Sequence, residues 1–493
     1  MKQAPAPLSA ALPLLAAGLL LSVAARAQDL ISVTVRDTLP GATANAAFDF
    51  AGFDLTAEYD VETSVVRYTM EDVDGSADTV SGAIARPLAP DGRRFPRTVY
   101  LHGTTQTKFD VPSREPSVMS FGSLAASLGY VVLSPDFLGM GDDEGFHPYV
   151  HARTEGLAAV RMLQALAQDD TYAASVTERL FLAGYSQGGH ASMATHELIV
   201  EEFADEFTVT AAAHMSGPYS ISTVMKDSVI LRDTTFRYPS FLPYTILAYQ
   251  TVYPELERDL SAIFRAPYVP LVERFRDEYE AGTYPLRELN ADLLAAYVAT
   301  EGDSTYFPGR YLDVDFFEAL RKDEDDPFNV ALRDNDVFDF DNPTPTQLLY
   351  CRADDQVSYL NSLLARDSLL ARGAAATQAT DVGPGLDHGD CIRPAITQMV
   401  AFFEGFREAT DLPEVPGSPG WTYLTADGGL RVYTGDDAAT YRLELVDALG
   451  RVTAAQRYRS GAFVPTATLP RGLAVVRVAD GAGRTATRKL LLR

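Results

Sequence analysis

A serine in the motif G-x-S-x-G is the first group in this sequence with the setting of a nucleophile. Residues 184–189 read GYSQGG with Ser186 at the centre; an apolar run at 180–184 predicts a buried strand before it, and apolar periodicity at 188–203 predicts a helix after it. Flanking glycines tolerate the sharp turn of such a strand–turn–helix, which holds the serine in a strained conformation. Because backbone N–H groups and the helix dipole favour negative charge at that helix end, we predict that Ser186 is a catalytic nucleophile rather than part of a structural turn.

An acylating serine needs a general base, and the base needs an orienting acid. Where the serine lies on a turn of this kind, the order along the chain is serine, acid, histidine. Of the seven histidines, only His388 follows Ser186 far enough along the chain to leave room for an acid between them. It lies in a polar, glycine-containing loop before a predicted helix. We therefore predict His388 as the base, against the alternative of an ordinary surface histidine.

Two adjacent carboxylates follow a predicted strand between the serine and the histidine. Residues 347–351 predict this strand, and Asp354 and Asp355 come directly after it. A carboxylate just past the C-terminal end of a parallel strand is where such sheets place function. Asp354 is preferred as the acid because of the D-x-x-V spacing: Val357, three residues later, would turn back into the core. Asp355 is the competing candidate, and Asp387, next to the histidine, is a third that we expect to hydrogen-bond locally.

The oxyanion hole is predicted from the two backbone N–H groups that form it in such sites. One belongs to the residue after the nucleophile, Gln187, and the other to the loop after the third strand. Residues 97–101 predict that strand, and Gly103 lets the backbone come close, so Thr104 is the predicted second donor. No cluster of ligand-type residues has the spacing of a metal site, so neither a metal nor an organic cofactor is predicted.

Short apolar or β-branched runs bounded by glycine, proline or aspartate predict the strands that position these residues. They fall at residues 65–70, 80–86, 98–101, 131–134, 180–184, 207–214 and 347–351. From about residue 124 such runs alternate with helical patterns, at 150–167 and 188–203, which predicts a mostly parallel sheet with helices on both faces. The polar, Gly/Ala-rich segment from 28 to about 50 is interpreted as a lead-in to these strands.

The chain is too long for a single core, and two stretches break the alternation. Within a catalytic domain at 28–410, residues 218–345 are rich in aromatic side chains separated by charged ones, which predicts a helical cap inserted over the edge of the sheet. The cap aromatics either line an acyl-binding pocket or form a core of their own. A Pro- and Gly-rich linker follows at 411–420. Beyond it, at 421–493, basic residues outnumber acidic ones and short alternating segments predict a small all-β, sandwich-like domain.

The N-terminus predicts export from the cytoplasm. Lys2 precedes an apolar stretch, and Ala-Arg-Ala at 25–27 fits a signal-peptidase site, so residues 1–27 are interpreted as a signal peptide. A membrane anchor is the alternative, but the apolar run contains Pro13 and falls short of the roughly 20 residues that a span needs. No later segment is long and apolar enough to cross a membrane, so we predict no integral membrane span.

Two cysteines, Cys351 and Cys391, stand close to the predicted acid and base. In an exported protein an even pair favours a disulfide, with two free buried thiols as the alternative. Cys351 lies three residues before Asp354, and Cys391 lies three residues after His388. A disulfide between them would tie the loop of the acid to the loop of the base.

The formal net charge of −26, from 41 basic and 67 acidic residues, limits the choice of partners. Nucleic acid and anionic membrane surfaces are polyanions, so both are disfavoured. The simplest interpretation is that the acidity keeps a secreted protein soluble.

The motifs around Ser186 resemble those of the secretory lipase-like family of α/β-hydrolases. The resemblance rests on GYVVLSPDFLGMG at 129–141, HPY at 147–149, GYSQGG at 184–189 and NDV at 335–337. It covers roughly residues 60–408 and implies an α/β-hydrolase fold, a lid-like insertion between the sixth strand and the acid strand, and hydrolysis of carboxylic esters. The family pattern maps nucleophile, acid and base onto Ser186, Asp354 and His388.

The C-terminal region resembles the sorting domain of type IX secretion substrates in Gram-negative bacteria. The matching segments are LELVDALGR at 443–451, LPRGLAVVR at 469–477 and RKLLLR at 488–493. Ala474 departs from the pattern, because the family usually has an aromatic residue after Gly-Leu. The resemblance implies recognition by the type IX secretion machinery and passage through the periplasm to a secreted or cell-surface location. A carbohydrate- or surface-binding β-module is the competing interpretation.

Together these features predict a carboxylic ester hydrolase, an esterase or triacylglycerol lipase, that acts on a small-molecule or lipid ester. A serine peptidase of the prolyl-peptidase kind is the first alternative, because it shares the triad geometry. The aromatic cap favours an apolar acyl group over a peptide. A non-catalytic surface-binding protein on a hydrolase scaffold is the second alternative, and the complete Ser–Asp–His set argues against it.

Overall fold

The computed structural model describes residues 29–114, 121–232, 235–374 and 376–407, together with the strands found between 422 and 492. The signal peptide predicted at 1–27 and the linker predicted at 411–420 lie outside the described residues. Within the described ranges, none of the helices combines the length and the apolar character that crossing a bilayer requires.

A large mixed sheet organises the described chain from residue 30 to residue 381. Its strand order is β1-β2-β3-β5-β4-β6-β7-β8-β9. The strands are β1 (Leu30–Leu39), β2 (Asp60–Glu71), β3 (Ala77–Leu88), β4 (Phe95–Leu101), β5 (Val131–Pro135), β6 (Val176–Tyr185), β7 (Val209–Met215), β8 (Thr346–Tyr350) and β9 (Thr377–Asp381). The pairs among β1, β2, β3 and β5 are antiparallel, whereas those from β5 through β4 to β9 are parallel. Every predicted strand overlaps an observed one, so the prediction of a mostly parallel sheet is confirmed.

Helices cover both faces of this sheet, as predicted. One core joins α3 (Ala152–Leu166) and α5 (Gln187–Glu202) to the sheet, and another joins α1 (Gly41–Ala51), α2 (Phe121–Ser127) and α12 (His388–Arg407) to the opposite face. Two further helices, α4 (Asp170–Ser175) and α11 (Leu360–Ala371), precede β6 and β9. In β6, Leu180 and Leu182 belong to the first core, whereas Phe181 and Ala183 belong to the second. This alternation explains why residues 180–183 of this strand are all apolar.

The segment interpreted as a lead-in, residues 28 to about 50, is part of the fold. The segment forms β1 and α1, and β1 pairs antiparallel with β2 at one edge of the sheet. Ile31, Val33 and Val35 alternate with polar residues, which is a strand pattern, although most of β1 is exposed. Its order comes from the ladder of backbone hydrogen bonds to β2, which a single sequence does not display. The alanine-rich α1 buries Ala44 and Phe48 against the core and ends at Gly52, in the left-handed conformation.

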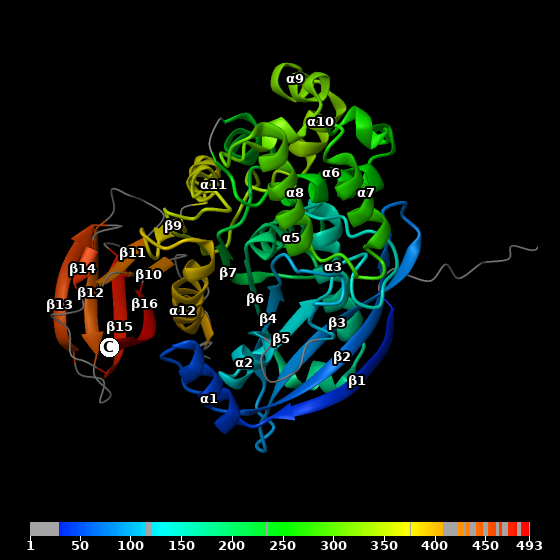
Figure 1. Ribbon diagram of the computed structural model, residues 1–493. Helices are drawn as coiled ribbons and strands as arrows, with labels where there is room; N and C mark the ends of the chain where they lie inside the picture. The colour runs from blue at the N-terminus through cyan, green and yellow to red at the C-terminus, as the bar shows by residue number, and fades with distance from the viewer. Residues whose placement is uncertain are drawn as a thin grey trace, which may run out of the picture.

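Between β7 and β8 the chain forms a set of helices, residues 221–334, that we call the cap (Figure 1). Its elements are the π-helix η1 (Ile221–Leu231), α6 (Phe241–Val252), η2 (Pro254–Leu256), η3 (Leu260–Ala262), α7 (Val269–Glu278), α8 (Leu286–Glu301), η4 (Pro308–Tyr311), α9 (Val314–Lys322) and α10 (Pro327–Asp334). Aromatic side chains such as Tyr249 and Tyr268 are fully buried in a core within the cap. Tyr149, before α3, joins this core and stacks on Tyr244 with ring centroids 4.3 Å apart. Most cap aromatics therefore hold the cap together and dock it on the sheet.

The C-terminal strands form two small antiparallel sheets that are separate from the large one, in the orders β10-β11-β14 and β13-β12-β15-β16. The strands are β10 (Thr422–Ala426), β11 (Gly429–Tyr433), β12 (Thr440–Val446), β13 (Val452–Arg459), β14 (Phe463–Pro465), β15 (Gly472–Asp480) and β16 (Thr485–Leu492). Tyr441, Leu443 and Val478 are buried between neighbouring strands. The prediction of a small all-β region here is confirmed.

Candidate active site

Ser186 lies on a strained turn between β6 and α5. Its φ of 61° and ψ of −125° place it outside the regions that non-glycine residues normally occupy. The three neighbouring glycines allow this geometry, because a Cβ on any of them would collide with backbone. Gly184 would meet the carbonyl of Gly188, Gly188 would meet that of Leu101, and Gly189 would meet that of Met215. Close backbone packing therefore requires glycine at these three positions. The turn places Ser186 at the end of the parallel strand β6.

The predicted base and acid are aligned on this serine. His388 Nε2 lies 2.9 Å from Ser186 Oγ, and His388 Nδ1 lies 2.7 Å from Asp354 Oδ2. The other carboxylate oxygen of Asp354 accepts the backbone N–H groups of Gln356 (3.0 Å) and Val357 (2.8 Å). The side chain of Asp354 is only 1 % exposed. Because the carboxylate of Asp354 accepts a hydrogen bond from His388 Nδ1, the proton of the neutral imidazole is on Nδ1. Nε2 is then free to accept the proton of Ser186.

The two competing carboxylates have other partners. Asp355 accepts the backbone N–H of His388 at 3.2 Å and the hydroxyl of Tyr238, a cap residue, at 2.9 Å. Asp387 accepts the backbone N–H of Asp390 at 2.9 Å, at the beginning of α12. Both therefore fix the backbone around the histidine, and neither is hydrogen-bonded to its ring.

A disulfide joins Cys351 to Cys391, with their Cα atoms 5.9 Å apart. It connects the end of β8, where the acid follows, to the first turn of α12, which begins at His388. Both cysteines are fully buried. The hydroxyl of Tyr185 donates to the carbonyl of His388 at 2.6 Å, so the turn that carries the histidine is held from two sides.

The two predicted oxyanion donors lie near the serine, at the start of α5 and in the loop after β4. Gln187 is the first residue of α5. In the loop, a Cβ on Gly103 would lie 3.6 Å from Ser186 Cβ, so this loop passes directly beside the serine. The hydroxyl of Thr104 is anchored on that of Tyr149 at 2.9 Å. In the described part of the chain, neither Thr104 nor Gln187 donates its backbone N–H to a protein acceptor, which leaves both groups available to a ligand.

A buried polar chain that the sequence analysis missed runs behind the serine. The amide of Gln187 donates to His147 Nε2 and to Glu155 Oε1, both at 2.8 Å. The second oxygen of Glu155 is 2.8 Å from His190 Nδ1, and His190 Nε2 is 3.0 Å from the carbonyl of Asn335. These side chains are at most 1 % exposed apart from Gln187, at 2 %. No sequence motif predicts these contacts. His147 belongs to the HPY segment, which contributed only to the family resemblance.

An apolar cavity of about 110 Å³ extends from Ser186 and Gln187 beneath the cap. Its walls are almost entirely hydrophobic and include Ile221, Met225, Ile246, Phe316, Leu320 and Phe328. The one charged residue in the wall, Lys226, donates to the side-chain oxygen of Asn329 at 3.0 Å. The cap thus contributes an apolar compartment that opens onto Ser186.

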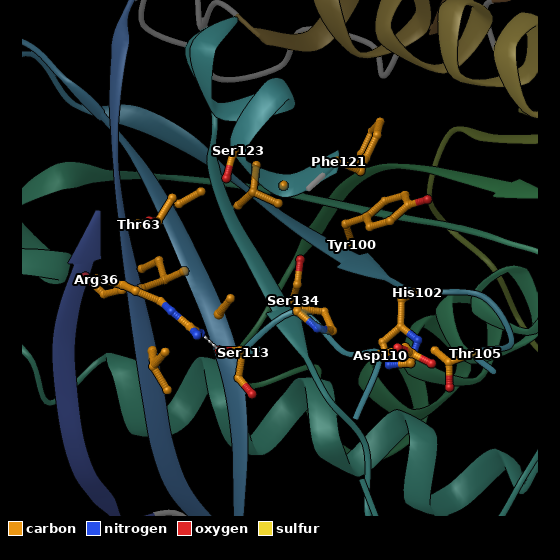
Figure 2. A pocket seen from close by; sticks show the side chains of 18 of the residues that line it. Arg36, Thr63, Tyr100, His102, Thr105, Asp110, Ser113, Phe121, Ser123 and Ser134 are labelled. Carbon is orange, nitrogen blue, oxygen red and sulfur yellow. Dashed lines mark hydrogen bonds between the residues drawn. The ribbon is translucent and has the colours of Figure 1, made fainter. Parts of the chain in front are cut away.

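A second, larger cavity of about 420 Å³ is lined in part by residues 102–106, the loop after β4 (Figure 2). His102 and Thr105 stand at one end of it, and Tyr100 and Phe121 at another. Its floor carries hydroxyl groups from the sheet, among them that of Ser134. This cavity is more polar than the one beneath the cap.

Solved structures with a similar architecture are known. A Legionella pneumophila protein with a provisional assignment as a hydrolase is 26 % identical, with a TM-score of 0.68 over 78 % of this chain and 99 % of that one. The rice cell wall degrading esterase LipA of Xanthomonas oryzae is 23 % identical, with a TM-score of 0.63 over 76 % and 96 % of the two chains. The chain has the α/β-hydrolase fold.

A more distant structure agrees with this fold. Candida antarctica lipase A is 15 % identical, with a TM-score of 0.53 over 78 % of this chain and 84 % of that one. No protein-family model matches the sequence, and no curated protein matches it significantly. Similarity to these solved structures therefore lies in the fold far more than in the sequence.

Proposed function

We propose that this protein is a serine hydrolase that cleaves carboxylic esters through an acyl-enzyme on Ser186. The observation that carries the proposal is the hydrogen-bonded series from Asp354 through His388 to Ser186, with distances of 2.7 and 2.9 Å. A serine, an imidazole and a buried carboxylate in this arrangement are the parts of an acyl-transfer site. The complete series also argues against a non-catalytic scaffold.

In the first half of the reaction, His388 Nε2 takes the proton of Ser186 as Oγ attacks the ester carbonyl carbon. The negative charge that forms on the carbonyl oxygen is stabilised by the N–H groups of Thr104 and Gln187. When the tetrahedral intermediate collapses, the ester C–O bond breaks and the alcohol leaves with the proton from Nε2. Asp354 stabilises the imidazolium that exists between these two proton transfers.

In the second half, water attacks the acyl-enzyme on Ser186. His388 accepts one proton of the water, and the same two N–H groups hold the second oxyanion. Collapse breaks the bond between the acyl carbon and Oγ, Oγ recovers the proton, and the carboxylic acid is released. The cycle consumes one water and needs no further reactant.

The apolar cavity beneath the cap supports an acyl group of hydrocarbon character. Its lining is hydrophobic from the serine to α9 and α10, so bound methylene groups are removed from water at about 0.8 kcal/mol each. Two proteins of the same fold are named as an esterase and a lipase. A peptide would bury its backbone polar groups against these walls without partners, which costs free energy.

Hydrolysis of p-nitrophenyl esters from acetate to palmitate tests this proposal. The Ser186→Ala variant is expected to lose at least about 10⁴-fold in kcat/KM, because the nucleophile is gone. Ser175→Ala is the matched control, since its hydroxyl only caps α4 by donating to the carbonyl of Tyr172. Equal activity in the Ser186 variant, or cleavage of proline-containing peptides but of no ester, would overturn the proposal.

We also propose that the protein is exported, with residues 421–493 as the sorting domain for type IX secretion. A buried disulfide is typical of proteins that fold outside the cytoplasm, and the all-β C-terminal region agrees with a separate domain. Deleting residues 421–493 is expected to trap active enzyme inside the cell. If the truncated protein is still secreted but loses adhesion to polysaccharide, the region is a binding module instead.

A further inference from the structure

We propose that Glu155 is a positioning residue of this active site. Its carboxylate holds the side chain of Gln187 and thereby the first turn of α5, which presents the oxyanion donor and the nucleophile. The inference rests on the proposed ester hydrolysis, and it adds a residue that does not touch the substrate.

The direction of each hydrogen bond at Gln187 follows from the partners. His147 Nδ1 lies 2.8 Å from the carbonyl of Leu138, which can only accept, so the ring proton is on Nδ1. Burial lowers the pKa of His147 to about 3, which keeps the ring neutral. Nε2 therefore has a free lone pair, and Gln187 must donate one amide hydrogen to it and the other to Glu155. Both hydrogens of the amide are used, so only one orientation of Gln187 satisfies the site.

The other oxygen of Glu155 is held as firmly. His190 has an acceptor at each ring nitrogen, Glu155 on one side and the carbonyl of Asn335 on the other, so it donates at both and is an imidazolium. Burial alone would lower the pKa of His190, but Glu155 and Asn335 raise it above its ordinary value. Glu155 and His190 are both fully buried, and each charge compensates the other where no water reaches them.

Close packing of two helices brings Glu155 to this position. Next to it in α3, Gly156 faces α5, and a Cβ there would lie only 3.2 Å from the carbonyl of Ala194. The beginning of α3 is fixed as well, because the backbone N–H of Ala152 donates to the side chain of Asn335 at 2.7 Å. Asn335 directly follows α10, the last helix of the cap. One buried hydrogen-bonded chain therefore connects the end of the cap, α3 and the turn of the nucleophile.

This arrangement matters for rate because oxyanion donors act only when they are placed in advance. Removing a donor lowers kcat by about 10²- to 10³-fold, and a displacement of about 1 Å in a catalytic geometry can cost about 10²-fold. Gln187 carries both the backbone N–H proposed to bind the oxyanion and the side chain that Glu155 holds. Releasing the side chain allows the first turn of α5 to move, while the cavity walls that the cap contributes stay in place.

The test compares Glu155→Leu with Glu155→Gln in the full-length protein. The leucine variant removes the acceptor for Gln187, and we expect kcat on the best p-nitrophenyl ester to fall about 10- to 100-fold with KM within about twofold. The glutamine variant can accept from Gln187 and donate to a neutral His190, which can still donate to Asn335. It is expected to restore kcat to within about threefold of the parent enzyme.

Two further measurements separate positioning from a general loss of structure. The rate at which a p-nitrophenyl phosphonate labels Ser186 needs the same oxyanion donors but no turnover, and it should fall in parallel with kcat in Glu155→Leu. Tyr68→Phe is the matched control, because its buried hydroxyl donates to Ala158 on the same helix α3 at 2.9 Å. This variant should keep kcat and the labelling rate unchanged.

If Glu155→Leu does not fold, Gly156→Ala provides the same test with every hydrogen-bonding group retained. The added methyl displaces α3 from α5 by a few tenths of an ångström, and a several-fold fall in kcat with KM unchanged is expected. A folded Glu155→Leu or Gly156→Ala variant with the parent kcat would overturn the positioning role. An unmodified protein that cleaves no ester would instead overturn the proposed function.

Discussion

Two carboxylate–imidazole pairs flank the turn at Ser186, and their geometry is nearly the same. Asp354 and His388 are 2.7 Å apart, and Glu155 and His190 are 2.8 Å apart. The first pair keeps a small exposure, with 7 % of the His388 side chain accessible, whereas the second pair is completely buried. They differ in the group that meets the second ring nitrogen.

At His388 that group is the hydroxyl of Ser186, which can both donate and accept. At His190 it is the carbonyl of Asn335, which can only accept. A ring facing a hydroxyl can take up a proton and return it, as a general base must. A ring facing a carbonyl must keep its proton, so it serves as a fixed cation. The group at the second ring nitrogen therefore decides whether a carboxylate–imidazole pair can transfer a proton or serves only as a fixed ion pair.

The largest expected effect is on activity and concerns the first pair. His388→Gln should lower kcat/KM for p-nitrophenyl esters by about 10⁴- to 10⁶-fold, because no group then removes the proton of Ser186. The thermal midpoint measured by circular dichroism should change little, since glutamine can still donate to Asp354. Retained activity in this variant would mean that the two pairs do not differ in the way proposed.

A smaller effect, on stability, is expected at the second pair. His190→Leu leaves the Glu155 carboxylate buried without its counter-charge, which should cost about 3–5 kcal/mol in the free energy of unfolding. Adding Glu155→Gln removes that charge and should recover a large part of the loss, as followed by urea denaturation. If the single and the double variant are equally unstable, the pair is not ionised in the folded protein.

The buried imidazoles without a carboxylate partner extend the comparison to pH. In the described residues these are His147, His151, His196 and His214. Burial lowers the pKa of His147 and His196 to about 3 and that of His151 to about 4, and it lowers the pKa of His214 strongly. Between an unfolded pKa of about 6.5 and these values, the unfolded chain binds more protons than the folded one, so stability falls as pH falls.

The expected loss is about 1.4 kcal/mol per pH unit for each such ring once the pH is below about 6. Urea denaturation at pH 7, 6 and 5 measures it. His196→Phe removes one titrating ring beside Phe340, whose ring centroid is 5.3 Å away, and should make the dependence on pH shallower. An unchanged slope in this variant would show that His196 is already protonated or accessible in the folded state.

The local parts of the site could be predicted from the sequence because short-range sterics dictate them. The glycines around Ser186 are needed because backbone lies too close for a Cβ. Asp354 follows a strand and accepts the backbone N–H groups of the residues two and three positions later. The order of serine, acid and histidine then left a single histidine to consider. Apolar runs predicted the buried strands for the same reason, since each has both faces covered.

The tertiary structure alone decided what is exposed or assembled from distant segments. β1 is an edge strand with few buried residues, and only its pairing with β2 decides its place in the sheet. Glu155 and His190 are paired with each other across 35 positions, and His190 reaches the carbonyl of Asn335 across 145. Long-range hydrogen bonds of side chains have no periodicity along the chain, so their partners become known only when packing brings α3, α5 and the end of the cap together.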